Sequence, residues 1–168
     1  MADSLPLDVL NTARQDDVAS ALLSCCAATA WVEAVLAARP YADRGALLAR
    51  SDEVFAKLAT ADVDAALAGH PRIGERATGQ GRDARWSRQE QASVSDADAD
   101  VQQRLREGNV AYERRFDRVF LIRAAGRSPQ EMLDELTRRL GSDADTEAAE
   151  VREQLRQITR LRLEALLA

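Results

Sequence analysis

The sequence predicts an all-α protein, a compact bundle of roughly seven to nine helices, and two observations support this prediction. Apolar residues recur three and four positions apart through most of the chain, which is the spacing of one face of an amphipathic helix. Only residues 119–122 form a strand-like apolar run, and so short a run could equally be the buried end of a helix. We find no internal repeat and no long linker, so residues 1–168 are expected to form one domain.

Four helices are expected in the first half of the chain. The first has Asp16 as its N-cap, the second ends at Pro40, and the fourth begins at the N-cap Thr60 and stops before Pro71, since proline cannot continue a helix. The apolar faces of the first three contain Val18, Leu22 and Cys25, then Trp31, Val35 and Leu36, then Leu47, Leu48, Val54, Phe55 and Leu58.

A loop followed by a helix is expected next. Residues 76–85 include Gly79 and Gly81 and show no apolar pattern, which predicts a mobile loop. Ser87 and Glu90 match a capping box, in which each side chain accepts a hydrogen bond from the other's backbone N–H. A helix is therefore expected to begin at Ser87.

Three further helices complete the predicted bundle. Residues 101–116 have helical spacing. A second capping box, Ser128 to Glu131 with Pro129 at the first helical position, opens a helix that continues to Leu140. The last helix runs from about Asp145 and carries its apolar face at Val151, Leu155, Ile158, Leu161, Leu163 and Leu166.

Composition narrows the classes of function. The net charge of −5 and the pI near 5.0 argue against general nucleic-acid binding, which depends on basic residues that neutralise phosphates. Arginine is abundant while Lys57 is the only lysine, but alanine is enriched as well, which indicates codon bias rather than a binding site. No apolar run is long enough to span a membrane, and residues 1–8 lack the pattern of a signal peptide, so a cytoplasmic protein is expected.

The two cysteines are adjacent, Cys25 and Cys26. Disulfides between neighbouring cysteines are strained and rare, so two buried free thiols in a reducing compartment are expected. One histidine and two neighbouring cysteines cannot complete a tetrahedral zinc site, so no metal site is expected.

His70 is the only histidine and therefore the first candidate for proton transfer near neutral pH. Pro71 disfavours the α conformation at His70, which places the imidazole at a helix end or on a loop. The alternative is a surface or capping histidine without a catalytic role.

Ser87, Glu90 and Gln91 would share one face of the helix expected to begin at Ser87. The N–H groups at a helix N-terminus favour an anion, so Glu90 should stay ionised there and could hold a protonated imidazole or accept a hydrogen bond from a substrate hydroxyl. Alternatively, Glu90 only completes the capping box and Gln91 is an ordinary exposed residue.

Arg127 follows Gly126, which allows a tight bend after the buried run. An arginine held by rigid neighbours can donate two hydrogen bonds to a carboxylate or to urea-like oxygens. The alternative is an exposed loop arginine, and it applies equally to Arg72 and Arg123.

Three segments, residues 70–75, 86–92 and 116–127, resemble in this order the decarboxylases of 2-oxo-4-hydroxy-4-carboxy-5-ureidoimidazoline (OHCU). These enzymes act in uric acid degradation and yield (S)-allantoin. The resemblance extends over almost the whole chain, through Leu22 to Cys26, Trp31, Arg39 to Tyr41, Gly108, Asn109, Tyr112 and Ile158 to Leu163. The chain departs from the family pattern at Asp117, where glycine is frequent, at Arg123, where cysteine is common, and at Ser142, where asparagine is common.

The resemblance implies a decarboxylation that needs no cofactor and no metal, with His70 as acid/base and Glu90 as its partner. It also implies substrate contacts from Pro71, Ser87, Gln91, Leu121, Ile122 and Arg127, and a homodimer as the assembly. Two alternatives stay open: a non-catalytic helical interaction module, which would need an exposed apolar patch, and another small-molecule enzyme on the same fold.

Overall fold

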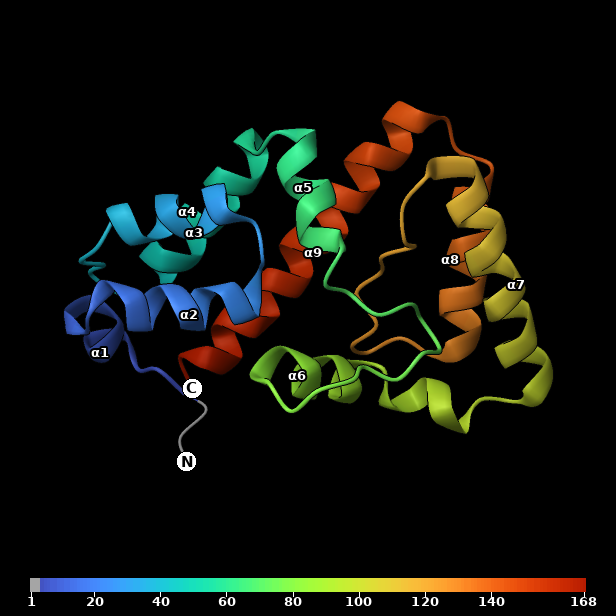
Figure 1. Cartoon of the computed structure of the whole chain (residues 1–168), viewed down its shortest axis with the longest axis horizontal. Coiled ribbons are helices and arrows are strands. Elements are labelled where there is room, and N and C mark those ends of the chain that lie inside the picture. The colour runs from blue at the N-terminus through green and yellow to red at the C-terminus, as the bar shows by residue number, and fades with distance from the viewer. Residues whose placement is uncertain (1–3) are drawn as a thin grey trace. The chain divides into compact units, whose positions relative to one another are not determined.

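A computed structural model describes residues 4–168 and contains nine α-helices and no β-strand in that range (Figure 1). The helices are α1 (Leu7–Thr12), α2 (Gln15–Cys25), α3 (Thr29–Ala37), α4 (Arg44–Lys57), α5 (Thr60–Leu67), α6 (Arg82–Glu90), α7 (Ala99–Phe116), α8 (Pro129–Leu140) and α9 (Ala144–Leu166), with a 3-10 turn, η1 (Ala92–Asp96), after α6. The prediction of an all-α protein with seven to nine helices is confirmed. Met1 to Asp3, the start of the segment tested for a signal peptide, lie outside the described residues. No helix from residue 4 onward has both the length and the hydropathy that crossing a membrane requires.

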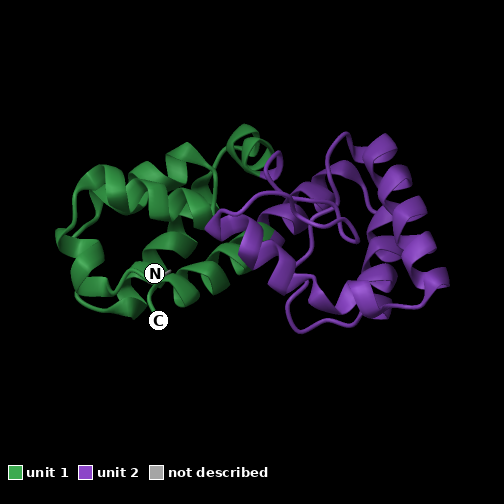
Figure 2. Ribbon diagram, turned by 60° about the horizontal axis from the view of Figure 1, so that its bottom comes forward, with its two compact units in different colours: residues 1–66, 155–168 green, residues 67–154 purple. Residues whose placement is uncertain are grey.

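The chain divides into two compact units (Figure 2). Unit 1 comprises residues 1–66 and 155–168, and unit 2 comprises residues 67–154. Helix α9 contributes its first part to unit 2 and the remainder to unit 1. The expectation of a single domain stays a prediction.

Unit 1 is held by apolar helix faces. Helix α3 packs against α2 and α4, and Trp31 is fully buried, with its indole Nε1 3.0 Å from the Ser51 hydroxyl and its ring centroid 6.2 Å from that of Phe55. Cys25 and Cys26 are buried free thiols, as predicted. Burial raises the pKa of the Cys26 thiol, which keeps it protonated.

Three details of unit 1 differ from the sequence prediction. Helix α2 has Arg14 as its N-cap, so Asp16 lies within the first turn and the prediction that it caps the helix was wrong. Helix α5 begins at Thr60 itself, and the Ala59 carbonyl accepts the first helical hydrogen bonds. Helix α1 was not predicted, because six residues with only Leu10 buried are too few to show a period.

Unit 2 is built on the pair α7 and α8. A side chain at Gly108 would bring its Cβ to 2.5 Å from Cδ2 of Leu136, so the glycine allows the close approach of the two helices. Their buried faces join apolar residues from the loops, and this core comprises Ile73, Val94, Leu105, Tyr112, Phe120, Ile122, Ala124, Met132, Leu133 and Leu136.

The Ser128–Glu131 capping box is present and both of its hydrogen bonds form, as predicted. Helix α7 ends at Phe116, and its C-cap residue Asp117 adopts a left-handed conformation (φ 54°) that glycine adopts without strain. This explains why a glycine is frequent at that position in the resembling family. Residues 119–122 are neither strand nor helix end, but a segment without regular secondary structure, in which residues 120–122 are buried.

The predicted capping box at Ser87 does not exist. Helix α6 begins earlier, at Arg82 after the N-cap Gly81, and the Arg85 N–H already donates to the Gly81 carbonyl at 3.1 Å. Ser87 therefore lies inside the helix and Glu90 is its last residue. The prediction that Glu90 lies at a helix N-terminus was wrong, since its carboxylate is at the opposite end of the helix dipole.

Candidate active site

His70 lies just beyond the end of α5, where its N–H donates to the Leu67 carbonyl at 2.9 Å. Pro71 follows and the chain leaves the helix, as predicted. The imidazole is partly buried and lines a cavity of about 270 Å³, together with Pro71, Ser87 and residues 75–78. His70, Pro71 and Ser87 therefore line the same cavity.

The segment that follows His70 is fixed by contacts to two helices. Ile73 is buried in the core of unit 2, and its carbonyl accepts a hydrogen bond from Asn109 Nδ2 at 2.8 Å. The Gly74 N–H donates to Gln91 Oε1 at 3.0 Å, and Gly74 has φ +92°, a conformation that favours glycine. These contacts restrain the loop that carries His70.

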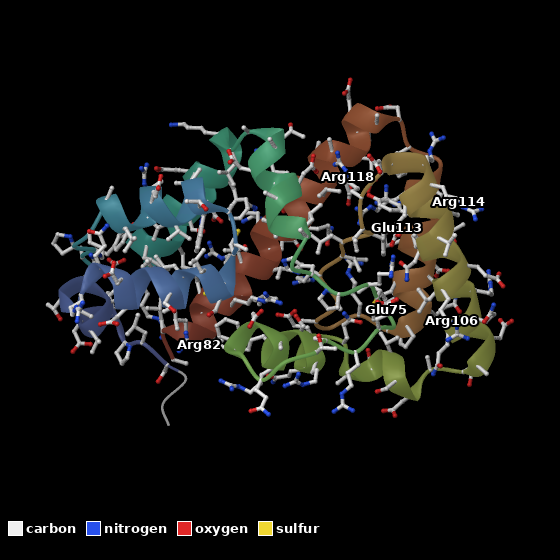
Figure 3. All side chains as sticks on the ribbon, viewed as in Figure 1. Glu75, Arg82, Arg106, Glu113, Arg114 and Arg118 are labelled. Atoms are coloured by element: carbon white, nitrogen blue, oxygen red, sulfur yellow. The ribbon has the colours of Figure 1, made fainter. Side chains whose placement is uncertain are left out.

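Arg72 is engaged in ion pairs rather than free to bind a substrate. Its guanidinium donates to both carboxylate oxygens of Glu113 on α7, at 2.5 and 3.0 Å, and to Glu75 on the same loop at 3.1 Å. Figure 3 shows Glu75 on the loop and Glu113 on α7. The hydrogen bonds to the two carboxylates raise the pKa of Arg72, and the guanidinium lowers the pKa of Glu113. Arg72 therefore ties the loop to α7.

Helix α6 supplies Ser87 and the residue that follows the helix, Gln91. Ser87 is buried and borders both the His70 cavity and a second cavity of about 330 Å³, which Gln91 also lines. Because Gly74 occupies the Gln91 oxygen, the amide nitrogen is the end of that side chain left to donate to a ligand. Arg88, from the same helix, donates to the carbonyls of Ala77 (3.2 Å) and Gly79 (3.0 Å) and so holds the loop between the two cavities.

Glu90, Leu121, Ile122 and Arg127 belong to the same unit but border neither of these two cavities. Glu90 is partly buried. Arg127 is partly buried too, and its Nε donates to the Arg123 carbonyl at 3.1 Å, across the bend at Gly126 (φ +78°). The tight bend predicted at Gly126 is confirmed.

Sequence analysis missed a buried charged group beneath residues 120–122. Arg139 and Glu147 are 0% and 1% exposed and form an ion pair, and the Tyr112 hydroxyl donates to the same carboxylate. Arg139 also donates to the Leu121 carbonyl at 2.7 Å. The family resemblance included Gly108, Asn109 and Tyr112, and that spacing was the available signal, since all three make the contacts that order unit 2.

The chain is similar to one protein family and to solved structures. A model of the family described as OHCU decarboxylase matches residues 11–164. Among solved structures, a crystal structure of OHCU decarboxylase in the presence of (S)-allantoin is 22% identical, with a TM-score of 0.74 over 86% of this chain and 95% of that one. A crystal structure of (S)-allantoin synthase is 16% identical, with a TM-score of 0.71 over 96% of this chain, which spans 54% of that protein. A search of curated proteins finds no match.

Proposed function

The chain belongs to the OHCU decarboxylase family, and we propose that it removes CO2 from 2-oxo-4-hydroxy-4-carboxy-5-ureidoimidazoline to give (S)-allantoin, with His70 as the acid/base and Glu90 as its partner. The observation that supports the role of His70 is the cavity that it lines with Pro71 and Ser87. The role of Glu90 rests on the family resemblance. His70 is the only histidine of the chain, and loop contacts to Asn109 and Gln91 hold its segment in place.

The substrate itself supplies the electron acceptor. Its carboxylate sits on a ring carbon that also carries a hydroxyl, beside a conjugated ring. When the bond to the carboxylate breaks, CO2 leaves, the electron pair stays on the ring, and the conjugated system accepts it. A proton must then be added to one face of the ring, which needs a positioned acid with a pKa near neutrality. His70 is the side chain proposed to deliver that proton.

The remaining side chains are proposed to orient the ring. Glu90 would polarise the substrate hydroxyl and orient the imidazole, while Pro71 forms the wall of the pocket beside it. Hydrogen bonds to the ring and ureido oxygens would come from the Ser87 hydroxyl, the Gln91 amide nitrogen, the terminal nitrogens of Arg127 and the N–H groups of Leu121 and Ile122. We further propose that the protein is a cytoplasmic homodimer, which sedimentation and fractionation of the native host would test.

The test follows the stereochemistry of the product. Urate is oxidised in situ so that the unstable substrate forms in the cuvette, the protein is added, and circular dichroism records the appearance of (S)-allantoin. Heat-inactivated protein is the control, because without catalysis allantoin forms slowly and as a racemate. A racemic product at the uncatalysed rate would refute the proposal.

A further inference from the structure

The buried pair Arg139–Glu147 contacts the backbone segment to which the proposed function assigns substrate binding. The guanidinium of Arg139 donates through Nε to both oxygens of Glu147, at 2.9 and 3.2 Å. A second nitrogen, Nη1, donates to the Leu121 carbonyl at 2.7 Å. Its planar group also lies 4.6 Å from the ring centroid of Phe120. One side chain thus joins α8, α9 and the irregular segment that contains Leu121.

Stability alone does not account for this pair. Taking two charges out of water costs several kcal/mol per ion, and an apolar pair of similar volume is often as stable or more stable. Tyr112 adds a hydrogen bond to Glu147, and burial, followed by this contact, raises the pKa of the tyrosine so that it remains a donor. These hydrogen bonds fix how the side chains of Arg139, Glu147 and Tyr112 lie relative to one another. The one contact of this group with irregular backbone is the hydrogen bond from Arg139 to the Leu121 carbonyl.

The N–H groups of Leu121 and Ile122 donate to no residue between 4 and 168, although both residues are buried. Buried N–H groups without an acceptor are rare and call for an explanation. The next N–H, that of Arg123, is occupied, because it donates to Gln154 Oε1 at 2.9 Å. Hydrogen bonds thus hold the backbone at the Leu121 carbonyl and at the Arg123 N–H, and the Ile122 N–H between them remains available to a ligand.

The Leu121 carbonyl and the Ile122 N–H belong to one planar trans peptide group and point in opposite directions. Whatever holds the oxygen therefore sets the direction of the N–H. A charge-assisted hydrogen bond to the oxygen also polarises the peptide and strengthens its N–H as a donor. We propose that Arg139 is a positioning residue that aims and polarises the Ile122 N–H toward the substrate. This inference rests on the proposed function, which assigns the Ile122 N–H to substrate binding.

The test compares two neighbouring substitutions, Arg139→Lys and Arg138→Lys. A lysine keeps the charge at 139 but cannot serve Glu147 and Leu121 together, since it lacks the planar fork. Arg138 is the matched control, because it is 51% exposed and pairs with Glu135 at 2.7 Å without contacting residues 120–122. Each ¹⁵N-labelled protein is titrated with (S)-allantoin while amide resonances are recorded, and kcat and KM are measured separately.

In the unaltered chain and in Arg138→Lys, (S)-allantoin is expected to shift the amide resonances of Ser87 and Ile122. In Arg139→Lys the Ser87 response should persist and the Ile122 response should disappear, with kcat lower by about tenfold and KM little changed, as a misdirected donor predicts. If Arg139→Lys does not fold, the double substitution Arg139→Met with Glu147→Gln removes both charges, leaves Tyr112 an acceptor, and should give the same result.

Two results would overturn the inference while the proposed function stands. In one, the unaltered enzyme turns over without an Ile122 response. In the other, a folded Arg139 variant keeps both the Ile122 response and kcat, which would make the pair purely structural. Absence of turnover and of any allantoin response in the unaltered chain would instead refute the proposed function, and the inference with it.

Discussion

The two units differ in the length of their connecting segments and in the contacts that hold them. In unit 1 the connections between α2, α3 and α4 are short, residues 26–28 and 38–43, and apolar helix faces meet around Trp31. Unit 2 contains two long non-helical segments, residues 68–81 and 117–128, which carry backbone groups that no helix satisfies. Side chains on its helices or at their ends bind that backbone instead, namely Asn109, Gln91, Arg88, Arg139 and Gln154.

This difference shows where chemistry can be placed on a helical scaffold. A helix uses its own N–H groups and carbonyls, whereas a non-helical segment held by side chains can present an imidazole or a free N–H. His70 and Ile122 both lie on such segments. The proposed site is therefore in the unit whose loops depend on polar contacts, and the following substitutions test that division.

The largest effect is expected in unit 1, from Trp31→Ala. Removing a fully buried indole leaves a cavity, and such losses cost about 3–5 kcal/mol in the free energy of unfolding. Urea denaturation followed by circular dichroism measures it. Trp31→Phe is the control and should cost less, since a ring still packs on Phe55. A loss below about 1 kcal/mol for Trp31→Ala would contradict the view that apolar packing holds unit 1.

In unit 2, His70→Ala and Glu90→Ala should each slow turnover at least about a hundredfold, equivalent to about 2.7 kcal/mol of activation free energy. Neither substitution should change the free energy of unfolding by more than about 0.5 kcal/mol, because neither group is fully buried. The exposed neighbour Gln89→Ala is the control for Glu90 and should leave both quantities unchanged. A destabilised Glu90→Ala protein with intact turnover would assign the carboxylate to the fold alone.

Helical periodicity was sufficient to predict most of the helices, because the apolar face of an amphipathic helix is the face that packs on the core. It predicted the helices that bury Val18, Phe55 and Met132. The capping motif at Ser128 was a separate, local signal, and the capping box is present. Periodicity failed for α6, whose first residues include only Ala84 buried, so that the favourable pattern at Ser87 was taken for the start of the helix. Where a segment shows no apolar period, a capping motif inside a helix can be mistaken for the start of that helix.

The site was predictable only in part, for a related reason. The single histidine followed by proline marked His70 as a candidate, and the spacing of Ser87, Glu90 and Gln91 offered Glu90 as its partner. The family resemblance then assigned a role to each of the two. No sequence pattern indicated Arg139 and Glu147 themselves, because they lie on different helices and each resembles a surface residue in sequence. The available signal was their partner Tyr112, which the family resemblance included. Contacts between side chains and distant backbone, such as Asn109 with Ile73, have no sequence period at all.

A smaller effect is expected where a helix binds the loop. Asn109→Ala removes the donor to the buried Ile73 carbonyl, which should cost about 1–3 kcal/mol in the free energy of unfolding. Val110→Ala, at the next position and 49% exposed, is the matched control and should change it by less than about 0.5 kcal/mol. Equal effects in the two variants would show that the loop does not depend on this polar contact. Unit 2 would then not differ from unit 1 in its dependence on polar contacts to the loop backbone.

The smallest effect is expected at the loop's second attachment to α7, the pair Arg72–Glu113. This pair is partly exposed, so Glu113→Gln should cost about 0.5–1 kcal/mol at pH 7, and less in high salt. Arg72 lowers the pKa of Glu113 below 4.5, so the folded state holds the carboxylate ionised at pH values where the unfolded chain is protonated. The stabilisation is therefore complete above about pH 4.5 and is lost as the pH falls through the lower, folded-state value. Urea denaturation at a series of pH values should show the two proteins converging below pH 4.5, whereas a difference independent of pH would mean that packing, and not charge, attaches the loop here.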